Sequence, residues 1–315
     1  MIVALAGGVG GAKLAQGLAA VVSDSLTVVV NTGDDFDLYG LRICPDLDTV
    51  LYTLAGIADP VQGWGVAGDT TATLDAIARL GRDPWFKLGD RDFATHIVRT
   101  ERLRAGAPLS VVTGELATAL GVRATILPMT DDPVATLVQT PGGTLPFQDY
   151  FVLRRQTDEV TGVTFAGIDQ AAPAPGLLDA IRQAEAIVFC PSNPFVSIGP
   201  ILAVPGVAAA SAASPAPVVA VSPIVGGQAI KGPAAKMFAS LGMEPSALAV
   251  ARRYVGQIDG LAIDEVDAAL APAIEALGIR PLVTRTVMGG FDDRARLATE
   301  TLAFARGLTP VESGA

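Results

Sequence analysis

The chain has 315 residues, of which 50% are hydrophobic and 17% charged, so it is long enough for one large domain or two small ones. A net charge of −10 argues against a nucleic-acid partner, because binding a phosphate backbone needs clustered Lys and Arg. Two cysteines and one histidine make neither a disulfide framework nor a multi-histidine metal site.

The apolar residues are mainly Ala, Val, Leu and Ile, which favours a parallel sheet covered by helices on both faces. No basic segment precedes the first apolar run, so no signal peptide is predicted. The apolar stretch 199–213 is interrupted by Pro205 and Gly206 and is shorter than the ~20 residues of a membrane helix. We expect a cytoplasmic protein without a membrane partner.

Residues 1–6 form a short apolar run that leads into a glycine-rich turn and then into a helical pattern. The amides of a helix N-terminus bind phosphate well, and glycines leave room for a ligand. We therefore expect Gly8, Gly10, Gly11 and Lys13 to bind the phosphates of a nucleotide.

The glycine turn departs from the known phosphate-binding motifs. Leu14 follows Lys13 where a Walker A loop has Ser or Thr, and Lys13 stands where a dinucleotide fingerprint has its third glycine. The turn therefore supports neither an ATPase nor an NAD enzyme. A strand-to-helix turn without a ligand is the alternative interpretation.

Four carboxylates follow the second predicted strand, residues 26–31, at the edge where parallel sheets bind their ligands. Asp46 is expected to cap the helix that begins at residue 47. Carboxylates facing a phosphate loop indicate a divalent cation, most simply Mg²⁺. We expect Asp35 and Asp48 to bind it, with Asp34 and Asp46 as neighbours that could substitute.

Helices are predicted at 70–80, from Asp90 onward, and at 108–121, and a third strand at 123–128. Lys87 stands alone among apolar residues just before the second of these helices. His96 lies one turn inside that helix, and a structural role is favoured over a catalytic one.

Residues 134–165 alternate and contain a Pro-Gly-Gly turn, which predicts a small insertion of antiparallel strands. Aromatic residues concentrate at 147–151, where the insertion would cover a planar ligand or form a dimer contact. We predict a nucleotide-binding core of residues 1–133 and 177–315, and an insertion with a linker at 134–176.

The βα alternation resumes with a helix at 177–184 and strands at 186–190 and 217–221. The loops after these strands contain Ser192, Asn193 and Ser222, which could bind a nucleotide, or could be ordinary turn residues. Further on, strands are predicted at 248–250, 261–263 and 281–284, and helices at 265–277 and 292–307. The predicted fold class is α/β, with a Rossmann-like, mostly parallel sheet.

Several stretches in register resemble one family, the 2-phospho-L-lactate transferases of coenzyme F420 biosynthesis. They are AGGVGGAK at 6–13, NTGDD at 31–35, ICPDLDTVLY at 43–52, LGDRDFATH at 88–96, PSNP at 191–194, SIGP at 197–200 and VSPI at 221–224. The resemblance extends over about residues 1–235.

The resemblance implies a Mg²⁺-dependent transferase that acts on the deazaflavin Fo. The terminal ribityl hydroxyl of Fo would attack the phosphorus that carries a three-carbon acid in a guanosine diphosphate conjugate, and GMP would leave. The family's Fo contacts correspond to Asp48 and Lys87, and Asp48 is the predicted catalytic residue, which would orient or deprotonate the hydroxyl.

The sequence leaves two points open, the identity of the transferred acid and whether the protein is an enzyme. The transferred group could be 2-phospho-L-lactate, phosphoenolpyruvate or a phosphoglycerate, which differ by only a double bond or a hydroxyl. A guanine-nucleotide-binding regulator on the same fold, without catalysis, is the second hypothesis. A homodimer formed through the insertion is also expected.

Overall fold

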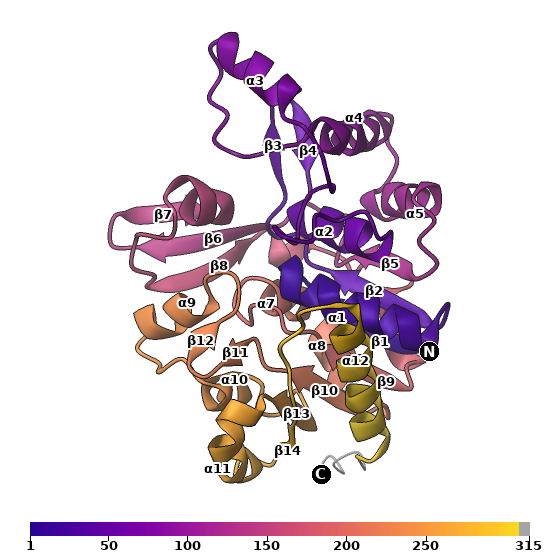
Figure 1. Cartoon of the computed structure of the whole chain (residues 1–315), viewed down its shortest axis with the longest axis vertical. Coiled ribbons are helices and arrows are strands. Elements are labelled where there is room, and N and C mark those ends of the chain that lie inside the picture. The colour runs from indigo at the N-terminus through magenta and orange to yellow at the C-terminus, as the bar shows by residue number, and fades with distance from the viewer. Residues whose placement is uncertain (309–315) are drawn as a thin grey trace.

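A seven-stranded parallel sheet forms the centre of the molecule (Figure 1). The computed structural model describes residues 1–308. The strands run in the order β14, β13, β10, β9, β1, β2, β5 across the sheet. Their bounds are β1 Ile2–Ala6, β2 Leu26–Val30, β5 Thr125–Pro128, β9 Ala186–Phe189, β10 Val218–Val221, β13 Gly260–Ile263 and β14 Arg280–Val283. The α/β fold class predicted from the sequence is confirmed.

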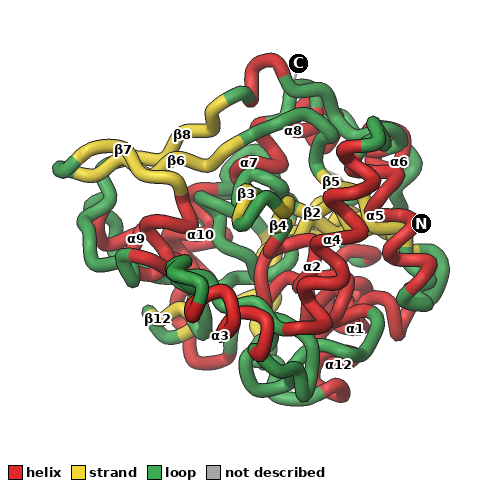
Figure 2. Tube along the Cα trace, turned by 90° about the horizontal axis from the view of Figure 1, so that it is seen from above, coloured by secondary structure: helices red, strands yellow, loops and turns green. Residues whose placement is uncertain are grey.

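Helices cover both faces of this sheet (Figure 2). One face is covered by α1 Gly8–Val22, α2 Pro45–Leu54, α5 Leu109–Ala119 and α12 Phe291–Arg306. The other is covered by α6 Leu177–Arg182, α7 Ile198–Ala203, α8 Val207–Ala212, α9 Ala234–Ser240 and α10 Ala247–Arg253. Val3 and Leu5 pack on the second face, whereas Ile2 and Ala4 pack on the first, as the two-residue period of a strand requires.

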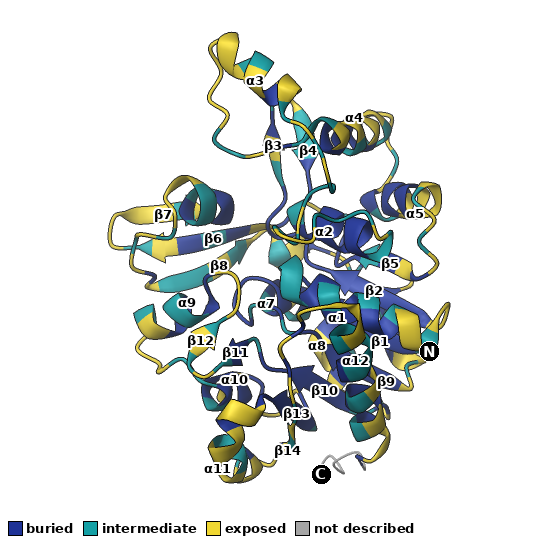
Figure 3. Cartoon of the chain, in the orientation of Figure 1, coloured by how far each residue is buried: buried dark blue, intermediate teal, exposed yellow. Residues whose placement is uncertain are grey.

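The apolar runs of β1 and β2 are buried along their whole length (Figure 3). They pair in parallel from Ile2 opposite Leu26 to Ala6 opposite Val30. The chain first extends the sheet to one side of β1, through β2 and β5, and then to the other side, through β9 and β10. The strand order therefore reverses between β1 and β9, where open α/β sheets bind ligands beyond the carboxyl ends of the strands.

A hairpin and two helices project from the carboxyl edge of the sheet (Figure 1). The hairpin pairs β3 Phe36–Leu38 with β4 Leu41–Ile43, and the helices are α3 Ala72–Arg79 and α4 Asp90–Arg104. Tyr39 and Gly40 form its turn with φ of 53° and 76°, and such a pair of positive values matches the twist of a tight hairpin.

The insertion is a three-stranded antiparallel sheet in the order β7, β6, β8. Its bounds are β6 Ala135–Thr140, β7 Gly143–Pro146 and β8 Gly162–Ala166. A π-helical turn at Asp149–Leu153 follows β7, and a 3₁₀ turn at Ile168–Gln170 follows β8. The predicted antiparallel insertion is thus present, with its aromatic segment at the side that faces the sheet edge.

Two predictions for the C-terminal part are wrong. Residues 248–250 lie in α10 and not in a strand, because Ser246 caps the helix by accepting a hydrogen bond from the amide of Ala249 (3.1 Å). The helix predicted at 265–277 is a 3₁₀ turn, Glu265–Leu270, followed by the short α11, Ala271–Glu275. Pro272 has no amide hydrogen, which suits only the first turn of a helix, so a new helix starts there.

A two-stranded hairpin, β11 Ile224–Val225 with β12 Gln228–Ala229, completes the described fold. Within residues 1–308, none of the helices has the length and apolar character needed to cross a membrane.

Candidate active site

A cavity of about 510 Å³ lies at the carboxyl edge of the sheet, next to the point where the strand order reverses. Its wall combines the glycine turn, Asp34 after β2, the acidic residues of α2, the loop after β9, and aromatic residues of the projecting segments, whereas Asp35 lies outside the lining. The residues that line it include Gly8, Val9, Gly10, Asp34, Asp46, Asp48, Tyr52, Trp64, Lys87, Asp92, His96, Phe147, Phe151, Ser192, Asn193 and Lys231.

The glycines of the turn have two different functions. Gly8 has φ of +61°, a left-handed conformation that favours glycine, and a Cβ there would have only Asp46 within 4 Å. A Cβ on Gly10 or Gly11, in contrast, would clash with the carbonyl oxygen of Pro191 or the hydroxyl of Ser192. Gly10 and Gly11 therefore permit close packing of α1 against the loop after β9, while Gly8 faces the cavity.

Some of the predicted phosphate ligands line the cavity and others do not. Gly8 and Gly10 line it, and first-turn amides such as those of Val9 and Gly10 have no acceptor inside the helix. Gly11 and Lys13 lie outside the lining, and the Lys13 ammonium donates to the carbonyl oxygen of Met288 (3.1 Å). Burial, together with the nearby cations Arg294 and Lys231, lowers the pKa of Lys13.

The predicted nucleotide contacts after β9 and β10 also differ from one another. Ser192 and Asn193 line the cavity, but the Ser192 hydroxyl donates to the carbonyl of Gly7 (2.8 Å) and accepts from its amide (3.0 Å). Ser222 lies outside the lining. Its hydroxyl donates to the carbonyl of Ile224 (2.8 Å) and thereby closes the turn after β10. Ser192 thus joins the ends of β1 and β9. The Asn193 side chain accepts from the amide of Phe195 (2.8 Å) and donates to the sulfur of Met237 (3.4 Å).

Asp46 does not cap α2, contrary to the prediction, because the helix begins at Pro45, two residues earlier than predicted, and its N-cap is Cys44. Its carboxylate instead accepts from the Gly8 amide (2.7 Å) and from the Asn31 side chain (2.9 Å). It therefore ties the glycine turn to the end of β2. Burial raises the pKa of Asp46 to about 6, against the lowering effect of these two hydrogen bonds.

Asp34 and Asp35 are buried and incompletely paired. One oxygen of Asp34 and both oxygens of Asp35 have no hydrogen-bond partner among the described residues. Burial raises the pKa of Asp35 to about 7, partly offset by Arg42, and burial with the charges of Asp46 and Asp35 raises that of Asp34. Buried carboxylate oxygens without donors, close enough to repel one another, fit a hard divalent cation such as Mg²⁺.

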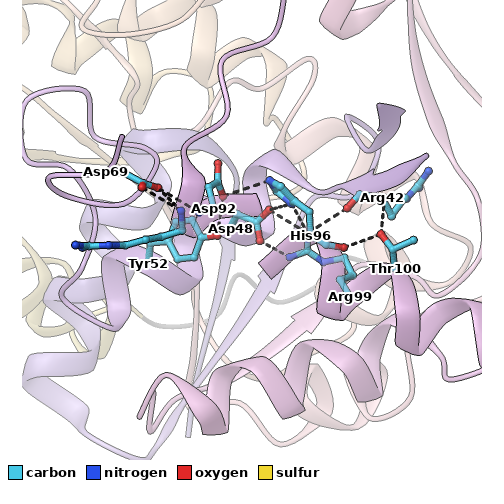
Figure 4. A network of polar contacts seen from close by, with 9 residues as sticks. Arg42, Asp48, Tyr52, Asp69, Asp92, His96, Arg99 and Thr100 are labelled. Atoms are coloured by element: carbon cyan, nitrogen blue, oxygen red, sulfur yellow. Dashed lines mark hydrogen bonds and ion pairs between the residues drawn. The ribbon is translucent and has the colours of Figure 1, made fainter. Parts of the chain in front are cut away.

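Asp48 is held by a buried arginine (Figure 4). Both carboxylate oxygens accept from Arg99, one from Nη1 at 3.0 Å and the other from Nη2. Burial by itself would lower the pKa of the Arg99 guanidinium, but the Asp48 carboxylate outweighs this effect and the pKa lies above its usual range. Asp48 is thus less free to bind a cation than Asp34 or Asp35.

His96 lies between two carboxylates, within reach of Asp48 (Nδ1 to Oδ2, 3.6 Å) and of Asp92 (Nε2 to Oδ1, 3.3 Å). Asp92 also accepts from the Tyr52 hydroxyl (2.7 Å). The sequence analysis did not identify Arg99, Tyr52 or Asp92 as functional. One signal was available: residues 92, 96 and 99 have the spacing of a single helix face.

The opposite wall of the cavity is aromatic and carries Lys87. The Lys87 ammonium donates to the Gln62 side chain (2.8 Å) and lies 5.6 Å from the centre of the Trp64 ring. Phe147 and Phe151 of the insertion stack with ring centres 5.4 Å apart. The two predicted Fo contacts, Asp48 and Lys87, therefore line one cavity whose aromatic surfaces suit a planar ring system.

The comparison with known proteins agrees with the motifs. Residues 2–275 match the family model for 2-phospho-L-lactate transferase CofD. A phosphoenolpyruvate transferase of Streptomyces griseus is 48% identical, covering 96% of this chain and 98% of its own. A 2-phospho-L-lactate transferase of Methanosarcina mazei is 40% identical, covering 94% and 98%.

Among solved structures, a UPF0052-family protein of Bacillus halodurans superimposes with a TM-score of 0.64 at 17% identity, covering 96% of this chain and 98% of its own. That likeness concerns the fold alone. The family model covers the insertion, every residue of the cavity described above and all strands of the central sheet except β14. The chain belongs to the 2-phospho-L-lactate transferase CofD family.

Proposed function

We propose that the protein transfers a phosphorylated three-carbon acid from its guanosine diphosphate conjugate to the ribityl hydroxyl of Fo, releasing GMP, in coenzyme F420 biosynthesis. The observation that carries the proposal is the shared cavity. It combines first-turn amides of α1 at Val9 and Gly10, buried carboxylates and an aromatic wall with Lys87, so one space offers surfaces for a diphosphate and for a flavin-like ring.

The reaction is a displacement at phosphorus. The ribityl oxygen of Fo forms a bond to the phosphorus that carries the acid, and the bond from that phosphorus to the bridging oxygen breaks, so GMP leaves with that oxygen. The hydroxyl proton moves to a base, which we assign to Asp48. Such a reaction depends mainly on alignment and on neutralising charge, which matches a site without a covalent nucleophile.

The diphosphate would lie against the first turn of α1, with the amides of Val9 and Gly10 directed at its oxygens. Asp34 and Asp35 would hold Mg²⁺, with Asp46 next to them; Asp48 is the weaker candidate, because Arg99 occupies its carboxylate. When bound, Mg²⁺ would neutralise the charge of the diphosphate. Asn193 is the remaining candidate for a contact to the nucleotide.

The names of relatives favour one three-carbon acid. The Streptomyces relatives at 46–48% identity are phosphoenolpyruvate transferases, whereas the Methanosarcina mazei relative at 40% is a 2-phospho-L-lactate transferase. We infer that the preferred donor carries enolpyruvate. Incubation with Fo, Mg²⁺ and guanylylated lactate, enolpyruvate or glycerate, followed by mass spectrometry of the Fo adduct, tests this inference. Preference for another acid would overturn the donor assignment, and absence of an adduct from all three would overturn the proposed reaction.

A regulator that binds a guanine nucleotide without catalysis is the competing function. It would bind GDP at equilibrium and give no turnover with any acceptor. The pairing of Asp48 with Lys87 in one aromatic cavity favours the transferase, because nucleotide binding alone does not need it. Cytoplasmic location and a homodimer formed through the insertion remain predictions, and analytical ultracentrifugation tests the latter.

A further inference from the structure

The carboxylate assigned as the base belongs to a closed ring of polar side chains from two helices (Figure 4). Asp48 and Tyr52 come from α2, and Asp92, His96 and Arg99 come from α4. All five are buried, at 5%, 1%, 6%, 1% and 1% exposure. We propose that Arg99, held in place by His96, is a positioning residue that fixes the Asp48 carboxylate toward the acceptor hydroxyl. This inference rests on the proposed function of Asp48.

The first link of the ring is a two-point contact. The guanidinium donates through Nη1 and Nη2 to the two oxygens of Asp48, and Nη1 also approaches the carbonyl of Arg42 (3.4 Å). A planar guanidinium that grips both oxygens fixes the rotation of a carboxylate as well as its charge. A lysine at the same place would supply the charge without the fixed geometry.

The second contact of the ring, made by His96, holds the Arg99 guanidinium in place. Nδ1 of His96 lies 3.3 Å from Nη1 of Arg99, and its Nε2 lies 3.3 Å from Asp92. Asp92 in turn accepts from Tyr52, which lies one helical turn beyond Asp48 on α2. The ring therefore returns to the helix on which it began, although its contact between His96 Nε2 and Asp92 is a close approach without hydrogen-bond geometry.

Hydrogen bonds near its N-terminus and around His96 hold α4, which carries three members of the ring, in place. The Asp69 carboxylate accepts from the amides of Arg91 (2.9 Å) and Asp92 (3.2 Å) in the first helical turn. The hydroxyl of Thr100 donates to the carbonyl of His96 (2.6 Å) and accepts from the amide of Arg42 (2.8 Å). The α4 backbone is thus tied down on both sides of His96.

The location of the ring points to the reaction and not only to stability. Asp48, Tyr52, Asp92 and His96 all line the cavity, whereas Arg99 lies behind them. Apolar residues of similar volume stabilise a fold about as well as a buried ion pair does. A buried charge retained directly behind a cavity wall is better explained by the orientation that it imposes on Asp48.

A cation site is the alternative use of these side chains. Asp48, Asp92 and His96 offer ligand atoms within 4.8 Å of one another. The Arg99 guanidinium, however, already supplies positive charge to both Asp48 oxygens and reaches the His96 ring. We therefore infer that the arginine takes the place of a metal here.

The experiment uses Arg99→Lys in the full-length protein, because this change keeps the charge and loses the two-point contact. We expect kcat to fall on the order of 100-fold, as for a small misplacement of a reacting group, with the KM of the guanylylated donor unchanged. Arg102→Lys is the matched control, because Arg102 lies on the same helix but is 41% exposed and paired with Glu115. It should keep the wild-type kcat.

A combined variant shows whether Arg99 acts through Asp48. Added to Asp48→Asn, Arg99→Lys should reduce kcat little further, since the carboxylate that it orients is already gone. Independent, multiplying losses would overturn the inference, as would wild-type kcat in Arg99→Lys alone. His96→Ala should reduce kcat less than Arg99→Lys does, because Arg99 would keep its two-point contact to Asp48 and lose only the contact to the His96 ring.

Two readouts do not depend on turnover. A crystal structure of Arg99→Lys should show the Asp48 carboxylate rotated from its wild-type orientation, and an unchanged orientation would overturn the inference even if the proposed reaction fails. Calorimetric titration of the wild-type protein with Mg²⁺, compared with Asp92→Asn, should give the same affinity. Loss of a binding event in that variant would establish a cation at this ring and contradict the positioning role. Absence of Fo-dependent turnover in the wild type would instead count against the proposed function.

Discussion

Removal of the Asp48 carboxylate should unbalance the most deeply buried arginine–carboxylate pair among residues 1–308. In Asp48→Ala the Arg99 guanidinium, 1% exposed, would keep its charge and lose its carboxylate partner, which leaves Nη1 only the Arg42 carbonyl (3.4 Å) and the His96 ring. Breaking such a pair on one side costs about 3–5 kcal/mol in the free energy of unfolding. Because a domain has about 5–15 kcal/mol in total, this change should remove between about a fifth and all of the stability.

Two further variants separate this loss of stability from the loss of activity. Asp48→Asn keeps one oxygen as an acceptor and should lose less stability, yet its turnover should fall by about 10²–10⁴-fold if Asp48 is the base. The double variant Asp48→Leu with Arg99→Leu removes both charges and should recover most of the stability while remaining inactive.

Urea unfolding followed by tryptophan fluorescence measures the free energies of unfolding. Asp37→Ala serves as the control, because Asp37 is exposed and its pairing with Arg42 (3.5 Å) should contribute at most about 1 kcal/mol. If Asp48→Ala unfolded with the same free energy as this control, the description of the Asp48–Arg99 pair as buried and mutually dependent would be refuted.

Three further changes test other parts of the site. Gly10→Ala should cost about 1–3 kcal/mol in urea unfolding, since its Cβ would clash with the Pro191 carbonyl; wild-type stability would contradict the close packing. Lys87→Met should weaken Fo binding by about 10–100-fold in a fluorescence titration and leave GDP binding unchanged. Burial raises the pKa of Asp35 from 3.8 to about 7. Between these two pH values the folded protein therefore holds more protons than the unfolded chain. Metal-free stability from this group should therefore fall as pH rises from about 4 to 7, and Mg²⁺ should raise Tm more at pH 8 than at pH 5.5; equal shifts would argue against these carboxylates as ligands.

The sequence predicts the core well because its signals are local. The apolar runs that became β1 and β2 are fully buried, and each leads into the polar turn that the pattern indicated. The antiparallel insertion was equally visible, through its alternation and its Pro-Gly-Gly turn. Where apolar content was the only signal, as at 248–250, helix and strand could not be distinguished, and the cap at Ser246 decided for the helix.

The site was harder to predict, because the residues that contact one another there are far apart in the sequence. Asp46 was a plausible cap, but the helix starts two residues earlier than predicted and the carboxylate contacts Gly8, 38 positions away. The pairing of Asp48 with Arg99 spans 51 positions, and no local pattern indicates it. Part of the cavity could be named from the motifs, as for Gly8, Asp48 and Lys87, whereas the functional contacts of Tyr52 and Asp92 required the fold.

The central claim is that one cavity brings a guanylylated three-carbon acid to the hydroxyl of Fo. GMP release by the wild-type protein, measured with donor and Mg²⁺ present and with Fo added or omitted, tests it most directly. We expect GMP in stoichiometric amount with the Fo adduct when Fo is present, and only background release without it. Equal GMP release with and without Fo would contradict the claim.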